Sequence, residues 1–133
     1  MDYDYYLKKR KPGPWTNEPD RVEFLHYAVE CIVLRTTMGH LCGYVKVPVG
    51  HPWHGQGYEE IDIGDYCPHG GLTFSGSLIK GAPEEWWVGF DCAHLDDLIP
   101  TSTHYDREEV YRDIEYVTNQ VKDLANELTA AKK

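Results

Sequence analysis

A buried β-strand is indicated by the segment Trp86-Trp87-Val88-Gly89-Phe90-Asp91-Cys92-Ala93-His94, which is rich in aromatic and apolar residues. A second strand-like segment precedes it in the chain, His69-Gly70-Gly71-Leu72-Thr73-Phe74-Ser75-Gly76. Glycine inside a strand often marks the close approach of another backbone or of a ligand. We therefore predict strands over residues 72–79 and 86–92, paired as an antiparallel hairpin around the turn at 80–83.

Successive side chains of a strand point to opposite faces of the sheet. By this alternation the core face should hold Trp86, Val88, Phe90 and Cys92. The other face should hold the polar or aromatic residues Trp87, Asp91, Thr73 and Ser75. The bare Gly89 between an indole and a carboxylate predicts a concave, acidic spot on that face. Antiparallel pairing also brings His69 and His94 to the same end of the hairpin.

The remaining pattern predicts an α+β fold, with a small, mainly antiparallel sheet and a C-terminal amphipathic helix. Apolar runs over residues 27–36 and 41–49 flank a short glycine-bearing turn, which indicates a central hairpin. Prolines and glycines from 48 to 64 predict a long aromatic loop. Asp106 and Glu109 resemble a capping box at the start of a helix. That helix should cover the sheet with a stripe formed by Val110, Ile114, Val117, Val121, Leu124 and Leu128.

Length and composition limit the class of protein. The chain has 133 residues, so we expect one α+β domain over residues 21–133, preceded by a flexible N-terminal arm at 1–20 that is rich in proline and basic residues. The net charge of −9 argues against nucleic acid as a partner. No run approaches the roughly 18 apolar residues of a membrane span. The acidic start and four scattered cysteines predict a cytoplasmic protein with reduced thiols.

Polar and aromatic residues of the predicted hairpin form a candidate binding site for a small polar ligand. An indole suits stacking, and hydroxyl, carboxylate and imidazole groups suit hydrogen bonding. The candidate ligand-binding residues are His69, Thr73, Ser75, Trp87, Asp91 and His94. The same histidines beside carboxylates also suit a catalytic divalent metal ion with an open position, whose candidate ligands are His69, Asp91, His94 and Asp97, with Asp96 as a substitute for the last.

Two other chemistries fit these residues. Cys67-Pro68-His69 and Cys92-Ala93-His94 are two C-x-H pairs that offer ligands for a structural zinc ion. Alternatively, Asp91 paired with one of the histidines can orient a water or accept a proton without any metal. Cys92 falls on the apolar face, where a thiol is expected to be inert.

Several motifs resemble a group of small proteins encoded by phages and prophages, over about residues 30–128. They are Cys42-Gly43-Tyr44-Val45, Gly50-His51-Pro52, His69-Gly70-Gly71-Leu72-Thr73 and the segment from Trp86 to His94. The group has no settled activity, so the resemblance assigns no role to any residue. It implies a phage-type accessory protein that acts in the host cytoplasm, where such proteins often counter host defences.

Three functions follow as hypotheses. The first is a binding protein for a small polar, nucleotide-like ligand that stacks on Trp87. The second is a metal-dependent small hydrolase that uses the same residues. The third is an acidic inhibitor that binds a host protein. A small sheet with exposed aromatic residues also favours assembly into a homo-oligomer.

Overall fold

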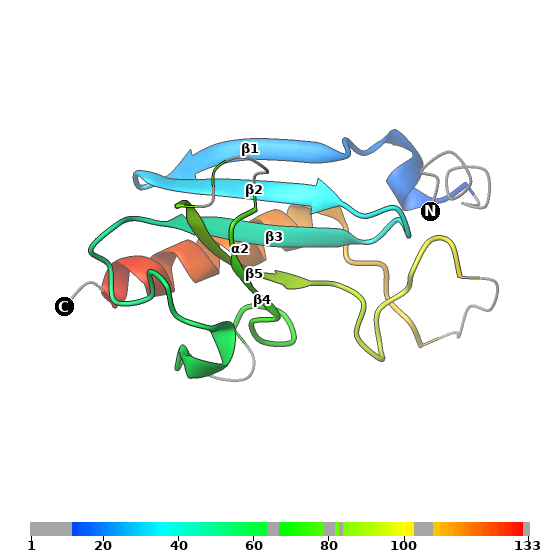
Figure 1. The fold of residues 1–133 in the computed structure, drawn as a ribbon. Helices are drawn as coiled ribbons and strands as arrows, with labels where there is room; N and C mark the ends of the chain where they lie inside the picture. The colour runs from blue at the N-terminus through cyan, green and yellow to red at the C-terminus, as the bar shows by residue number, and fades with distance from the viewer. Residues whose placement is uncertain (1–11, 64–66, 79–81, 83, 103–107, 132–133) are drawn as a thin grey trace.

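The protein folds as a five-stranded antiparallel sheet with one long helix across one face (Figure 1). A computed structural model describes residues 12–63, 67–78, 82, 84–102 and 108–131. The strands follow one another across the sheet in the order β1-β2-β3-β5-β4. This architecture confirms the predicted small α+β fold.

The predicted central hairpin is confirmed. Strands β2 (Val29–Arg35) and β3 (Leu41–Val47) pair around a turn at Gly39, and both are largely buried. An additional edge strand, β1 (Arg21–His26), pairs with β2 and was not predicted. Its alternating exposed and half-buried residues are typical of a strand that is covered on one face only.

The second predicted hairpin is also present, although its first strand is short. Strand β4 (Phe74–Gly76) is much shorter than the predicted 72–79, whereas β5 (Trp86–Asp91) matches the prediction closely. Strand β5 lies between β3 and β4, so it is paired along both edges. This central position explains why β5 is more apolar than β4.

The helix α2 (Ile114–Ala130) begins later than predicted. Its N-cap is Asp113, whose carboxylate accepts a hydrogen bond from the backbone of Tyr116 at 2.8 Å. Val110 therefore lies outside the helix, in a short parallel bridge with Asp97. Asp106, the predicted start, lies outside the described residues. The predicted capping box does not start the helix, because Val110 is paired with Asp97 in this bridge instead.

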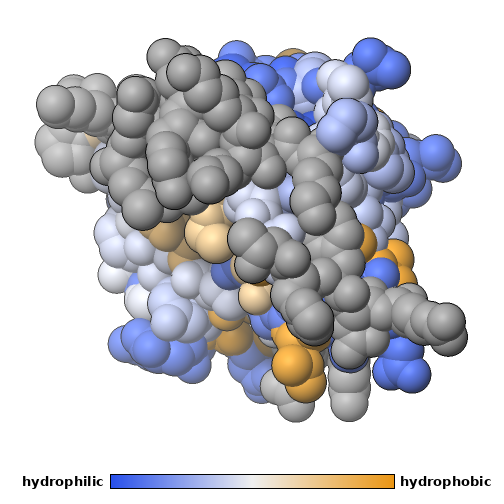
Figure 2. All heavy atoms as spheres, turned by 90° about the vertical axis from the view of Figure 1, so that its right-hand side faces the viewer, coloured by the Kyte–Doolittle hydropathy of each residue, from blue (hydrophilic) through white to orange (hydrophobic). Residues whose placement is uncertain are grey.

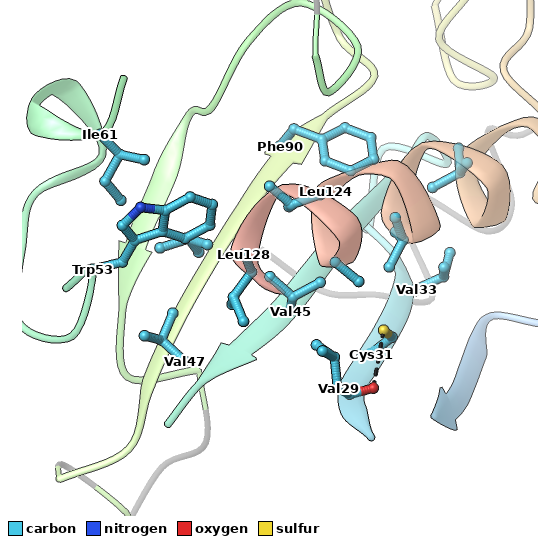
Figure 3. Packing of buried hydrophobic residues seen from close by; sticks show 14 of the residues in the cluster. Val29, Cys31, Val33, Val45, Val47, Trp53, Ile61, Phe90, Leu124 and Leu128 are labelled. Atoms are coloured by element: carbon cyan, nitrogen blue, oxygen red, sulfur yellow. Dashed lines mark hydrogen bonds between the residues drawn. The ribbon is translucent and has the colours of Figure 1, made fainter. Parts of the chain in front are cut away.

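The core lies between α2 and the face of the sheet that it covers, called here the helix face. Apolar residues of the helix pack on alternate residues of the strands (Figure 3), including Val33, Val45, Val88, Phe90, Val117, Val121, Leu124 and Leu128. A Cβ on Gly43 would overlap Val121, so this glycine permits close contact between helix and sheet. As predicted, Trp86, Val88 and Phe90 of β5 and the following Cys92 all pack toward the core.

Residues 12–20 are docked on the body rather than flexible, which corrects the prediction for this part of the arm. They contain a short helix, η1 (Pro14–Asn17), in which Trp15 is buried against Tyr111. Glu18 then accepts a hydrogen bond from the backbone of Ile114, the first residue of α2, at 2.9 Å. The segment is therefore fixed to the start of the helix by both apolar packing and a charged contact.

The described residues of the loop between β3 and β4 are irregular, as predicted, apart from the short helix η2 (Tyr58–Glu60). Trp53 and Ile61 of this loop are buried at one end of the core (Figure 3). In the described part of the chain, no helix has the length and apolar character needed to cross a membrane.

Candidate metal centre

Two loops and the start of α2 meet beyond the end of β5. His94 and Asp97 follow β5 in a tight turn, in which the backbone of Asp97 donates to the carbonyl of His94 at 2.9 Å. His69 precedes β4, the antiparallel neighbour of β5, so both histidines lie at the same end of the hairpin. Their rings are 5.4 Å apart at an interplanar angle of 78°, which confirms the predicted proximity of His69 and His94.

The carboxylate of Asp97 is the centre of this cluster. Its side chain is 1% exposed, and both oxygens receive hydrogen bonds. Oδ1 accepts from Nε of Arg112 at 2.8 Å and from Nε2 of His69 at 2.9 Å. Oδ2 accepts from the backbone N–H of His94 at 2.9 Å and from its Nδ1 at 3.2 Å. We call His69, His94, Asp97 and Arg112 the Asp97 cluster.

Asp97 stays ionised in this environment. Burial alone would raise the pKa of its carboxyl group, because desolvation disfavours the charged form. The hydrogen bonds from Arg112 and His69 outweigh that effect, and the pKa lies below its ordinary value. A carboxylate that is both buried and charged is a strong ligand for a cation.

His69 is oriented from both sides. Its Nδ1 lies 2.6 Å from the hydroxyl of Tyr116, in the first turn of α2. The backbone N–H of His69 donates to the side-chain oxygen of Gln120, one turn further along, at 2.8 Å. Because Asp97 is an obligate acceptor, Nε2 of His69 carries the proton of that bond, and in a neutral ring Nδ1 then accepts from Tyr116.

His94 has one nitrogen held and one without a partner. Its Nδ1 faces Asp97, and no residue in the described part of the chain bonds to its Nε2. The His94 side chain is 33% exposed, more than those of the other members of the cluster. The ring lies against Gly70, where a Cβ would overlap it and where φ is +70°. Glycine is therefore needed here for both backbone conformation and space.

Asp91 lies at the margin of the cluster. Its Oδ1 is 4.0 Å from Nδ1 of His94, beyond hydrogen-bond distance. The carboxylate is held instead by the hydroxyl of Thr73 at 2.9 Å and by the backbone N–H of Ala93 at 3.0 Å. The predicted ligand residues Thr73 and Asp91 are therefore bound to each other beside the histidines.

Ser75 and Trp87 lie away from the cluster. Ser75 pairs with Val88, so it belongs to the helix face, and its hydroxyl accepts from the backbone of Tyr58 at 2.9 Å. The prediction that Ser75 shares a surface with Trp87 and Asp91 is therefore wrong. Trp87 is on the predicted face, but it is only 3% exposed, which leaves little of the indole for a ligand to stack on.

The concave spot predicted at Gly89 is filled by protein. The ring of Tyr44, from β3, lies where a Cβ of Gly89 would be, and Phe74 packs edge-on against it at 5.4 Å. Two aromatic rings thus separate the Trp87 end of β5 from the Asp91 end. One pocket containing both residues, as predicted, is ruled out by this packing.

The cysteines do not take part. In the part of the chain that the structure describes, the group able to hold a metal ion consists of His69, His94 and Asp97. Cys92 is buried on the helix face, and burial raises the pKa of its thiol well above the ordinary value. The zinc site formed by two C-x-H pairs is therefore not assembled.

Four residues near the centre were not among those predicted from the sequence. Tyr116 and Gln120, in the first turns of α2, reach His69, and Arg112, just before α2, reaches Asp97; only tertiary packing brings these residues together. The spacing of Tyr116 and Gln120 by four residues places them on one side of the helix, which was the available signal. His40, before β3, is buried, and its Nδ1 lies 3.2 Å from the Thr36 hydroxyl. Burial lowers its pKa despite the opposing charges of Asp91 and Asp97.

The Asp97 cluster lies at the end of the molecule where β5 finishes. Figure 2 views this end, and hydrophilic side chains prevail over the described residues that it shows, with hydrophobic groups in separate small patches. A cavity of about 290 Å³ adjoins the cluster on the side of Gly70 and Gly71 and is also lined by Tyr58 and Ile63.

Comparison with known proteins found no significant match to this chain among protein-family models, curated protein sequences or solved structures.

Proposed function

We propose that this protein binds a divalent metal ion through His69, His94 and Asp97 and uses it in the hydrolysis of a small polar substrate. The observation that carries the proposal is the convergence of one ligand atom from each residue, all within 4.8 Å of one another, around a buried carboxylate. Two imidazoles and one carboxylate form a ligand set that suits Zn²⁺ and related first-row ions.

The groups around these ligands support the same proposal. Ligating histidines generally bond through the second ring nitrogen to a neighbour that fixes the ring. The hydroxyl of Tyr116 is such a neighbour for His69, at 2.6 Å from Nδ1. Asp97 is likewise held by Arg112 and by the backbone of His94. The bonds to Asp97 from Arg112 and from the backbone of His94 involve neither ring, so an ion could bind without breaking them. If Nε2 of His69 held the ion, its Nδ1 would carry the proton and donate to Tyr116.

Three protein ligands favour a catalytic site over a structural one. Structural zinc sites are usually closed by four protein ligands, whereas catalytic sites keep one position for water or substrate. An ion with such an open position polarises the group bound there and makes a bound water a stronger nucleophile near neutral pH. Asp91 lies outside the set of three, with Oδ1 at 4.0 Å from Nδ1 of His94, and would be the nearest further carboxylate to a group bound by the ion.

One observation favours a second candidate, a base that needs no metal. Nδ1 of His94 faces Asp97 while Nε2 has no partner in the described part of the chain. A carboxylate bound to one nitrogen orients an imidazole so that the other can accept a proton. In this alternative, His94 is the base and His69 a further support for Asp97.

Metal titration decides between the two candidates. Protein treated with a chelator is titrated with Zn²⁺ and with Mn²⁺ by calorimetry, and one ion per chain is expected. His94→Ala should weaken binding by more than about 100-fold, since changes to residues behind the ligands already cost roughly 10- to 100-fold. The matched control is His26→Gln, because His26 bonds Asn126 at the opposite end of the sheet (Figure 1).

A wild-type chain that binds neither ion would contradict the metal proposal and leave the His94 base as the remaining candidate. Equal affinities in wild type and His94→Ala would place any bound ion elsewhere. The role in countering host defences, the protein partner and the homo-oligomer all stay predictions, because no observation on this chain bears on them.

A further inference from the structure

Arg112 contributes only one nitrogen to the Asp97 cluster. Its Nε donates to Asp97, and within the described residues neither Nη atom has a hydrogen-bond partner. The guanidinium carbon lies over the Tyr116 ring, 5.1 Å from its centre, a cation–π contact that helps to hold the group. Arg112 is therefore held in place, and the outer edge of its guanidinium remains available.

A structural arginine in the same chain is used differently. Arg35 donates from Nε, Nη1 and Nη2 to five partners, and its side chain is fully buried. Arg112 is partly exposed at 21%. Neutralising Asp97 needs only the contact from Nε, so it does not account for an oriented, accessible pair of Nη groups.

Arg112 also supplies a charge that the surrounding segments lack. Between Thr36 and Asp106 the sequence contains just two cations, Lys46 and Lys80. Lys46 is engaged by Glu30 at 3.4 Å and Glu85 at 3.0 Å. The approach to α2 thus brings a cation to a site otherwise made of carboxylates and imidazoles.

We propose that the ligand of this site is an oxyanion, a phosphate or carboxylate group, which Arg112 binds through its two Nη atoms while the metal ion holds another oxygen. The inference rests on the proposed function. Arg112 contacts Oδ1 of Asp97, and His94 contacts Oδ2, so the guanidinium and the ion would flank the same carboxylate. A planar guanidinium matches two oxygens of an oxyanion.

The test uses inorganic phosphate and acetate as probes. Zinc affinity is measured first, and the zinc-loaded chain is then titrated with each anion. Arg112→Gln should weaken binding of the preferred anion by roughly tenfold or more, since it removes charge-assisted hydrogen bonds. Arg112→Lys keeps the charge but not the planar pair of donors and should weaken binding as well. The control is Arg21→Gln, because Arg21 pairs with Glu23 on the surface.

Preference for phosphate or for acetate identifies the class of oxyanion, and either supports the inference. It is overturned if the zinc-loaded wild type binds neither anion, or if both Arg112 variants bind as wild type does. Arg112→Lys decides alone if Arg112→Gln does not fold, as judged by circular dichroism. If the wild type binds no zinc, the metal proposal fails separately. Phosphate binding to the zinc-free chain and its loss in the Arg112 variants then decide the oxyanion inference.

Discussion

Two buried charged groups lie on either side of the approach to α2, and they are satisfied in different ways. We call Arg35 with Glu18, Asp20 and Tyr111 the Arg35 cluster. The side chain of Arg35 is 0% exposed and that of Asp97 is 1% exposed, so each is fully removed from water. Buried charges of this kind must be paired. The two clusters meet that requirement with different partners, and this difference separates a structural role from a functional one.

The Arg35 cluster is complete. Every nitrogen of Arg35 donates, to Asp20, Glu18, the Tyr111 hydroxyl and the carbonyls of Pro19 and Gly39. The Asp97 cluster is incomplete, because Nε2 of His94 and both Nη atoms of Arg112 have no partner among the described residues. A complete cluster holds segments together, whereas unused polar atoms near the surface are available to a ligand.

Neighbouring residues connect the two clusters. Tyr111 belongs to the Arg35 cluster, Arg112 to the Asp97 cluster, and Asp113 caps α2. Glu18 of the first cluster also accepts from the backbone of Ile114. The start of the helix is thereby fixed from both sides. Positioning of His69 by Tyr116 and Gln120 depends on this fixed start.

The largest expected effect is on stability, in the Arg35 cluster. Arg35→Met should lower the free energy of unfolding by about 3 kcal/mol, because removing one member of a buried ion pair leaves the other without compensation. Glu18 and Asp20 would both lose this charge partner, and Glu18 is the more buried of the two, with a side chain only 13% exposed. Urea denaturation measures the change. Arg21→Met removes a surface pair and should cost less than about 1 kcal/mol. Equal losses in both variants would contradict the assignment of Arg35 as a structural centre.

The parts of the fold that are set by local periodicity could be predicted from the sequence. Alternation placed Val88 and Phe90 of β5 in the core, and antiparallel pairing placed His69 beside His94. The predicted face of Ser75 is wrong because a shift of pairing by one residue reverses the face of a strand, and the sequence does not show the register.

The rest of the site depends on tertiary packing. Gly89 suggested a hollow, but the neighbouring strand proved to be β3, which fills the space with Tyr44. Asp97 is among the predicted metal ligands, but its central position depends on Arg112, just before α2, and on Tyr116, in its first turn. No local pattern relates residues 69, 97 and 112, so their contacts could not be derived from spacing.

A smaller effect is expected from Tyr116→Phe, which removes the hydroxyl that contacts His69 of the Asp97 cluster. The ring of His69 would lose its partner at Nδ1 while Nε2 keeps its place. Zinc affinity should fall by about tenfold, at the lower end of the range for groups behind a ligand. Calorimetric titration measures the change, and Tyr111→Phe, which alters the Arg35 cluster, serves as the matched control. A larger loss of zinc affinity in Tyr111→Phe would show that the two clusters are not functionally distinct.

The smallest effect is expected on the stability of the Asp97 cluster, and it distinguishes the two clusters most sharply. In metal-free protein, His94→Ala should lower the free energy of unfolding by less than about 1 kcal/mol, as expected for the loss of one hydrogen bond from a partly exposed ring. Asp97 would keep its bonds from Arg112, from His69 and from the backbone of residue 94. Urea denaturation in the presence of a chelator gives the value. A loss as large as that of Arg35→Met would mean that His94 completes a structural cluster, and the distinction drawn between the two buried charges would fail.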